Sequence, residues 1–407
     1  MSSNPIAPDM AVEQLRKEGY KVEICDQHLL VHAVPFVTSK KVVRHGTIVC
    51  KYLKQGDQVI PPNNTQHDNH QVWWTEEYPC YPDGTELGLG KGEATRELLP
   101  GLMVKNQFSS KPDKFHQTGY PNHYEKIVHY VGVIQNQAKA IDPDVDARTA
   151  EIVPTQEGES VFRYPDTASA RAEILAISYK LAVKRIAIVG LGGTGSYLLD
   201  QVAKTPVGEI HLFDGDIFNS HNAFRSPGAA SLTEINSKEP KVDYFFRKYD
   251  PMRRGIIPHA YFLDESSVQE LANFDFVFLC VDNGEARAVL VRFLMENNTP
   301  FVDSGMNLNI VAETNSLIGT CRATYVTAER NSHVDDYIPM GSDDDEDAVY
   351  RQNIQVADMN AINALLAVMK WKQHIGFYDD NFKSINISFA VNLMSLNRGP
   401  KKSCEDE

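Results

Sequence analysis

The sequence predicts an α/β fold in which a doubly wound, mostly parallel sheet is preceded by a smaller α+β or mostly β domain. Three features of the 407-residue chain support this prediction. A β-branched apolar run, residues 186–189, ends at a glycine-rich turn and is followed by an amphipathic helix pattern. Strand and helix patterns then alternate as far as Asp303, as they do in parallel sheets. The first 150 residues instead show short strand patterns separated by turns.

A glycine-rich turn, Gly190-Leu191-Gly192-Gly193-Thr194-Gly195, joins the first predicted strand to its helix. Glycines let the backbone approach a phosphate, and the helix N-terminus offers free N–H groups there. The next predicted strand, residues 210–213, ends at Asp214, whose carboxylate would meet ribose hydroxyls. This is the pattern of a Rossmann-like nucleotide site. Its predicted nucleotide-binding residues are Gly190, Gly192, Gly193, Gly195 and Asp214.

Polar and cationic residues beyond Asp214 distinguish the predicted site from one for NAD. The loop after this residue ends in Arg225, and Lys238 lies thirteen residues further along. Asp282-Asn283 follows a later predicted strand. An arginine, a lysine and an Asp–Asn pair at the strand ends of one sheet suit a triphosphate with Mg²⁺.

These motifs, taken in order, resemble those of the ThiF/MoeB/HesA superfamily, the adenylating enzymes related to ubiquitin-activating enzyme. The resemblance spans residues 163–377 and includes the glycine-rich turn. The residues that match the superfamily's D-x-D…N-x-x-R block are Asp214, Asp216, Asn222 and Arg225. Ser226 stands where the superfamily usually has Gln.

The resemblance also implies roles for residues that follow this block. Lys238 is the best match to the lysine that binds the triphosphate, and Lys241 is the rival assignment. Asp282 matches the aspartate linked to Mg²⁺, and Asn283 would support the same loop. The competing interpretation of Asp282 is that it caps the helix that begins near residue 285.

The function that the resemblance implies is ATP-dependent adenylation of a carboxylate, with ATP and Mg²⁺ as cofactors and Arg225, Lys238 and Asp282 as catalytic residues. The expected substrate is the C-terminus of a ubiquitin-like or sulfur-carrier protein in a bacterial conjugation or defence pathway. A carboxylate in a ribosomally made precursor peptide is the alternative. Superfamily members usually pair, so a homodimer is expected. Arg171, or alternatively Arg163, would then reach the partner's ATP.

Six cysteines are spread along the chain without C-x-x-C spacing. We therefore expect reduced thiols and, in contrast to many superfamily members, no structural zinc. The cysteine that many members place on a crossover loop, where it forms a thioester, has no counterpart here. Cys321 and Cys80 are the remaining candidates for that role, and the simpler interpretation is that both are buried.

Two other functional classes are considered. A nicotinamide oxidoreductase would use Asp214 but leaves Arg225, Lys238 and the Asp282-Asn283 pair unexplained. A non-catalytic scaffold that binds a partner would account for Ser226 and for the missing acceptor cysteine.

The composition sets limits on partners and location. A net charge of −14 argues against a general nucleic-acid binder, because such a protein has a basic face. No apolar run approaches the length needed to cross a membrane, and the N-terminal residues lack a basic and then hydrophobic signal. We expect a cytoplasmic protein that binds neither nucleic acid nor a membrane.

Residues 1–150 are expected to form the smaller domain, and residues 151–160 a polar linker to an adenylation domain at 161–407. The smaller domain resembles an uncharacterised domain fused ahead of bacterial superfamily members, and partner or substrate docking is the expected role. Its histidines, among them His67 and His70, are interpreted as loop residues rather than metal ligands. The predicted elements are a helix at 11–18, a hairpin turning at 26–27, a strand pair at 42–53 that turns at 45–46, and a strand at 72–74.

The adenylation domain has the clearer pattern. Its predicted elements after residue 160 are helix 167–181, strands 186–189 and 210–213, helix 233–249, strand 255–263, helix 265–273, strand 274–281, helix 285–297, strand 299–303 and helix 359–375. An acidic run at 342–347 is expected to be a solvated loop.

Overall fold

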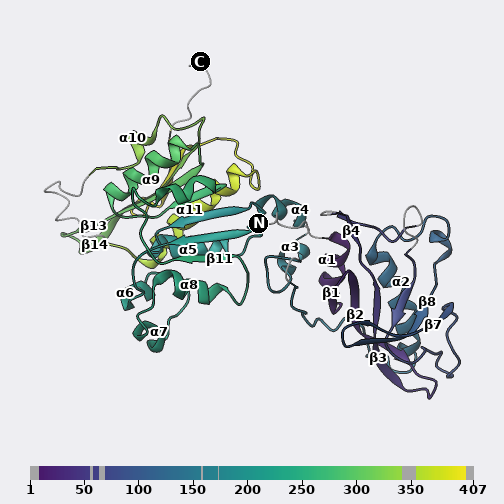
Figure 1. Ribbon diagram of the computed structural model, residues 1–407. Helices are drawn as coiled ribbons and strands as arrows, with labels where there is room; N and C mark the ends of the chain where they lie inside the picture. Colours follow the sequence, from purple (N-terminus) through teal and green to yellow (C-terminus); the bar gives the residue numbers. More distant parts are fainter. Residues whose placement is uncertain are drawn as a thin grey trace. The chain divides into compact units, whose positions relative to one another are not determined.

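The protein is described by a computed structural model that covers residues 9–55, 58–63, 69–156, 159–172, 174–341 and 354–399 (Figure 1). The side chains at positions 93, 94, 170 and 171 are not described. His67, the acidic run 342–347 and Cys404 therefore lie outside the described residues, as does the side chain of Arg171. The chain divides into two compact units, Ile6–Leu175 and Ala176–Glu407. The predicted α/β class with a preceding, mostly β domain is confirmed.

The N-terminal unit is built on a six-stranded antiparallel sheet with the strand order β1-β2-β3-β6-β8-β7. Its strands are β1 (Val22–Cys25), β2 (His28–Val37), β3 (Val43–Lys51), β6 (Val72–Trp74), β7 (Lys91–Leu99) and β8 (Leu102–Phe108), with β4 (Lys54–Gln55) and β5 (Gln58–Val59) paired separately. The helices are α1 (Met10–Lys17), the 3-10 turn η1 (Asp113–Phe115), α2 (His123–Lys139) and α3 (Thr167–Arg171). The first hairpin turns at Asp26-Gln27, where both residues have positive φ, as a tight hairpin requires.

The predicted turn at residues 45–46 is wrong, because β3 runs straight through it. A Cβ at Gly46 would lie 2.5 Å from Cζ2 of Trp74 on the neighbouring strand. The glycine therefore makes room for a buried tryptophan instead of reversing the chain. Trp74 is fully buried in the core that forms between the sheet and the helices α1 and α2.

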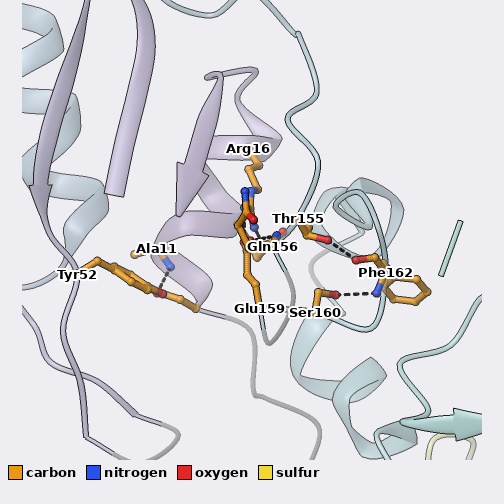
Figure 2. A network of polar contacts seen from close by, with 10 residues as sticks. Ala11, Arg16, Tyr52, Thr155, Gln156, Glu159, Ser160 and Phe162 are labelled. Carbon is orange, nitrogen blue, oxygen red and sulfur yellow. Dashed lines mark hydrogen bonds and ion pairs between the residues drawn. The ribbon is translucent and has the colours of Figure 1, made fainter. Parts of the chain in front are cut away.

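Residues 151–156 and 159–166 pack on the N-terminal unit, and the compact units divide beyond them, after Leu175. The contact centres on Arg16 of α1, which forms ion pairs with Glu13 at 2.7 Å and with Glu159 at 2.5 Å (Figure 2). The second carboxylate oxygen of Glu159 accepts from the backbone N–H of Gln156 at 3.0 Å. All three charged side chains are at most 12% exposed. Burial raises the pKa of Glu13 although the arginine opposes this.

The C-terminal unit is built on an eight-stranded sheet with the order β11-β10-β9-β12-β13-β14-β15-β16. Strands β11 to β13 pair in parallel, and β13 to β16 pair antiparallel. The strands are β9 (Arg185–Val189), β10 (Glu209–Phe213), β11 (Ile256–His259), β12 (Phe276–Leu279), β13 (Phe301–Val311), β14 (Ser316–Val326), β15 (Asn386–Ala390) and β16 (Ser395–Arg398). The expected strand at 299–303 is thus the start of a much longer strand that returns as a hairpin.

Helices cover both faces of this sheet, as the doubly wound pattern predicts. They are α4 (Leu175–Ser178), η2 (Tyr179–Leu181), α5 (Gly193–Val202), α6 (Ser220–Ala223), α7 (Leu232–Asn236), α8 (Lys241–Tyr249), η3 (Val268–Asn273), α9 (Gly284–Glu296), α10 (Val334–Tyr337) and α11 (Ala357–His374). Helix α11 packs with α5 over one core, and α9 lies over the other. No helix in the described part of the chain is long and apolar enough to cross a membrane.

Two predicted helices are interrupted. The helix expected at 233–249 is divided into α7 and α8, because Lys238 adopts a positive φ of 52° and Pro240 precedes the first residue of α8. Ser231 and Glu234 form a capping box that begins α7 separately. The helix expected at 167–181 is likewise divided into α3, α4 and η2.

The Arg16 contact generates a stability prediction. Replacing Arg16 by Met leaves two buried carboxylates, Glu13 and Glu159, without their cation, and we expect the free energy of unfolding of this unit to fall by about 3 kcal/mol. Lys91→Met, which removes the exposed pair with Glu86, is the matched control and should leave stability unchanged. Urea denaturation followed by tryptophan fluorescence measures both. Equal stability of the two variants would contradict the role given to Arg16.

Candidate functional site

The glycine loop between β9 and α5 is shaped by close backbone contacts. Gly190 has a φ of +91°, and a Cβ there would lie 2.6 Å from the carbonyl oxygen of Cys280, at the end of β12. A Cβ at Gly195 would lie 1.9 Å from the carbonyl oxygen of Gly190. Neither position can carry a side chain without moving the loop. These contacts hold the start of α5 against the carboxyl ends of two strands.

Helix α11 closes one side of the same loop. A Cβ at Gly193 would lie 2.0 Å from Nδ2 of Asn360, a fully buried residue of this helix. Thr194 donates from its hydroxyl to Oδ1 of Asn360 at 3.1 Å and accepts from Nδ2 of Asn363 at 3.3 Å. Gly192 differs from its neighbour, because nothing lies within 4 Å of a Cβ there. The open side of the loop therefore faces the pocket that is described below.

The carboxylate of Asp214, at the end of β10, ties the glycine loop in place. Its two oxygens accept from the backbone N–H of Leu191 at 2.6 Å and of Asp216 at 2.8 Å. Asp214 is 4% exposed, so these bonds replace the water that a free carboxylate would hold. The residue predicted to bind the ribose thus has a structural role as well, because it links two strand ends.

Lys241, rather than Lys238, lies at this carboxylate. Its Nζ is 2.6 Å from Oδ2 of Asp216 and 3.5 Å from Oδ2 of Asp214, and the residue is only 5% exposed. Lys238 is exposed and donates to Oδ1 of Asn219 at 3.0 Å, outside the pocket lining. The rival assignment of the triphosphate lysine, Lys241, is therefore the one that the geometry supports.

The predicted Asn–Arg pair follows on a short helical turn. Asn222 is buried, accepts from the N–H of Asn219 at 2.8 Å, and its backbone oxygen accepts from the hydroxyl of Ser226 at 2.8 Å. Ser226, which replaces the usual Gln, therefore fastens this turn. The guanidinium of Arg225 lines the pocket, and its buried Nε has no partner among the described residues. A polar group left in this state is an expected contact for an anionic ligand.

The loop after β12 supplies Asp282 and Asn283 to the pocket wall. The N-cap of α9 is Asn283, whose side chain accepts from the N–H of Ala286 at 2.8 Å, so the capping role considered for Asp282 belongs to its neighbour. Asp282 is exposed on the wall. The described residues contain no cluster of three or more His, Cys, Asp or Glu side chains placed to hold a metal ion. A single carboxylate with substrate phosphates is nevertheless the donor set that Mg²⁺ usually takes.

A pocket of about 980 Å³ gathers these groups at the carboxyl edge of the parallel strands. The predicted residues that line it are Gly190, Gly192, Gly193, Asp214, Asp216, Arg225, Asp282 and Asn283, and Lys241 lines it too. A second pocket of about 820 Å³ shares six lining residues with the first, namely Thr194, Cys280, Val281, Asp282, Asn283 and Gln355. The roles of Asn360 and Asn363 could not be predicted from the sequence, because a helix pattern gives no indication of which face meets a loop 166 residues earlier.

The cysteines considered as acceptors are inaccessible. Cys321 is fully buried under α11, and burial raises the pKa of its thiol to about 11. Cys80 is 1% exposed and donates to the backbone oxygen of Tyr78, and burial together with Glu86 raises its thiol pKa. Neither thiol is placed to attack an acyl-adenylate as a thiolate.

Comparison with known proteins places this site in a family. The ThiF family model matches residues 171–393 of the chain, more than half of its length. The chain belongs to the ThiF family. Residues 10–167 match a domain of unknown function (DUF6791), in agreement with the uncharacterised N-terminal domain that the sequence suggested.

Curated relatives match part of the chain. Ubiquitin-like modifier-activating enzyme 5 of Drosophila virilis is 29% identical over 184 residues, which cover 41% of this chain and 44% of the relative. The enzyme of the same name from Xenopus laevis is 24% identical over 247 residues, covering 56% and 60%. The chain thus spans about half the length of the curated relatives it matches.

Solved structures that match part of the chain include E. coli MccB with ATP, at 15% identity and a TM-score of 0.46, covering 57% of this chain and 70% of that one. PaaA is another, at 14% identity and a TM-score of 0.42, covering 56% and 75%.

The glycine contacts predict opposite outcomes for two neighbouring substitutions. Gly195→Ala forces a Cβ against a backbone oxygen and should lower the free energy of unfolding of the C-terminal unit by roughly 3 kcal/mol. Gly192→Ala, at the N-cap of α5, has open space and should cost less than about 1 kcal/mol. Thermal unfolding without nucleotide measures both. A Gly195→Ala protein as stable as the Gly192→Ala protein would refute the described loop.

Because the thiols of Cys321 and Cys80 are buried, we expect both to react slowly with alkylating reagents. Iodoacetamide at pH 8 should label Cys321 and Cys80 only after denaturation, because both thiols are covered and protonated at that pH. Peptide mass spectrometry of native and urea-treated protein checks this. If either residue of the native protein were labelled as fast as free cysteine, that residue would again be a candidate acceptor.

Proposed function

We propose that the C-terminal unit catalyses ATP-dependent adenylation of a carboxylate. The observation that carries this proposal is the convergence of the glycine loop, Arg225, Lys241 and Asp282 on one pocket. Two cations and an anion-binding loop suit a triphosphate, whereas a nicotinamide site needs neither cation. Membership of the ThiF family and the similarity to ubiquitin-like modifier-activating enzymes support the same chemistry.

In the proposed reaction, an oxygen of the substrate carboxylate forms a bond to the α-phosphorus of ATP. The bond between the α-phosphorus and the bridging oxygen to the β-phosphorus breaks, and pyrophosphate leaves with that electron pair. Arg225 and Lys241 would compensate the charge that develops on the phosphates. The step needs no covalent residue and no proton transfer, because the carboxylate is already the nucleophile.

Lys241 must exchange partners for this role. In the structure it contacts Asp214 and Asp216, and the carboxylate of Asp216 is 58% exposed. A triphosphate bound over the glycine loop would compete with this exposed carboxylate for the ammonium group. Asp282 is the residue that would hold Mg²⁺, which supplies charge neutralisation to the pyrophosphate when bound.

The proposed substrate is the C-terminus of a ubiquitin-like or sulfur-carrier protein, in a bacterial conjugation or defence setting. The name of the curated relatives, ubiquitin-like modifier-activating enzyme 5, supports the ubiquitin-like substrate alone. A carboxylate in a ribosomally made precursor peptide is the second candidate. Burial of Cys321 and Cys80 favours this second candidate, because a product that leaves as an adenylate or amide needs no acceptor thiol. Pairing of two copies, with Arg171 or Arg163 reaching the partner's ATP, is part of the proposal.

Calorimetric titration with ATP and Mg²⁺ tests the site directly. We expect Lys241→Ala and Asp282→Ala to weaken ATP binding by roughly tenfold or more, because each removes a charge contact to the phosphates. Lys238→Ala is the matched control and should bind as the unaltered protein does, since its ammonium group contacts Asn219 outside the pocket.

The alternative functions give different results in the same titration. Binding of NAD without ATP would favour an oxidoreductase, and binding of neither nucleotide would favour a scaffold. Loss of ATP binding in Lys238→Ala but not in Lys241→Ala would contradict the assignment of the phosphate-binding lysine.

A further inference from the structure

The second pocket lies beside a strand edge that no described strand covers. Pairing between β12 and β13 ends at Leu279 and Asp303, but β13 continues to Val311 and pairs there only with β14. Five consecutive residues of this continuation, Ser304–Leu308, line the second pocket. Backbone groups along such an edge can hydrogen-bond an extended peptide as an added strand.

A buried cluster with excess positive charge lies under this edge. Asp303 is fully buried and forms ion pairs with two arginines, with Nε of Arg287 at 3.0 Å and with Nη2 of Arg322 at 2.8 Å. Arg287 is further held by the backbone oxygens of Val281 and Pro339. Two guanidinium groups thus face one carboxylate in this cluster, in a protein whose net charge is −14.

Gly305 allows Arg322 to reach towards the edge. The two residues are register partners on β13 and β14, and a Cβ on Gly305 would lie 3.0 Å from Nε, Cζ and Nη2 of Arg322. The guanidinium therefore lies across β13 in the space that a side chain would fill. Of its five N–H donors, one contacts Asp303 and another contacts Oγ1 of Thr324 at 2.8 Å.

A strand added to the free edge would lie about 4.8 Å from β13 and about 10 Å from β14. A side chain on the same face as Arg322 and opposite Gly305 would then meet the guanidinium directly, because the glycine between them contributes no side chain. The complementary partner for an arginine at this position is a carboxylate.

Helix α11 contributes an acceptor to the lining of the second pocket. Asn363 of α11 is 1% exposed and lines the second pocket, and its Oδ1 has no partner in the part of the chain that the structure describes. Its Nδ2 is fixed to Thr194 of the glycine loop. A peptide N–H that enters from the second pocket could therefore be bound next to the loop where the phosphates would lie.

We propose that the second pocket binds the tail of the acyl substrate as a strand added to β13, and that a carboxylate side chain near the end of this tail pairs with Arg322. The inference rests on the proposed adenylation, because it needs the reacting carboxylate to reach the shared wall at Thr194 and Asp282. Arg322 lies too far from the glycine loop to contact that reacting group, since β9 and β13 are separated by β12. It is a specificity residue and selects an acidic side chain within the last few residues.

Synthetic pentapeptides test the proposal with the full chain and a non-hydrolysable ATP analogue. The peptides consist of glycine with Asp, Ala or Lys at one of the last three positions, and fluorescence anisotropy measures their binding. At one position we expect the Asp peptide to bind roughly tenfold or more tightly than the Lys peptide, as for one charge-assisted contact. Arg322→Glu should reverse this order.

Arg322→Glu places a second carboxylate beside the buried Asp303 and could prevent folding, so further variants test the same proposal. Arg322→Gln should abolish the Asp preference without reversing it, and Gly305→Ala should weaken it by displacing the guanidinium. Arg330→Glu is the control, because the guanidinium of this arginine donates to the backbone oxygen of Lys383 and the residue lines neither pocket. ATP affinity should be unchanged in all of them.

The outcomes separate the two proposals. If the protein bound ATP but bound the Asp, Ala and Lys peptides equally well at every position, the tail site would be overturned and adenylation would stand. An unchanged preference for the Asp peptide in Arg322→Gln would have the same meaning. Failure of the unaltered protein to bind ATP would contradict adenylation itself, and the tail site with it.

Discussion

The structure of the site depends on the carboxylate of Asp214. By accepting from Leu191 and Asp216, it links the glycine loop after β9 to the loop after β10, and it places Lys241 between them. The same glycine loop meets the end of β12 at Cys280 and the first turns of α11 at Asn360. Four elements from distant parts of the chain thus meet at one turn, in which Gly190, Gly193 and Gly195 have no room for side chains. A nucleotide bound there would find the backbone of the glycine loop already in position, which reduces the ordering cost of binding, and Lys241 would still have to exchange partners.

The two pockets share one wall, and we propose that adenylation takes place in one and substrate selection in the other. The nucleotide pocket collects Arg225, Lys241 and Asp282, whereas the second pocket combines an open strand edge with the Asp303 cluster. Their shared wall is where the carboxylate and the α-phosphate would meet in the proposed reaction. The long β13–β14 hairpin, which extends beyond the parallel strands, makes this division possible.

Much of the fold could be predicted because its signals are local. The strand at 185–189, the glycine loop and the helix ending at 202 follow from a short apolar run, a turn and a periodic pattern, and Asp214, Arg225 and Asp282 follow from strand ends. What could not be predicted depends on contacts distant in sequence. Spacing favoured Lys238, but the positive φ at that residue turns the chain so that Lys241 enters the pocket. In the sequence Gly46 favoured a turn, whereas in the structure it makes room for Trp74. No local pattern predicts that Arg322 pairs with Asp303.

The most direct test of adenylation measures whether an oxygen atom of the substrate carboxylate is transferred to AMP. A substrate peptide labelled with ¹⁸O in its terminal carboxylate would be incubated with the protein, ATP and Mg²⁺, and the nucleotide product examined by mass spectrometry. If the carboxylate attacks the α-phosphorus, later attack on the acyl carbon leaves one labelled oxygen on AMP, and we predict that product together with pyrophosphate. Unlabelled AMP, or ADP with free phosphate, would show that water or another group is the nucleophile and would contradict the proposed reaction.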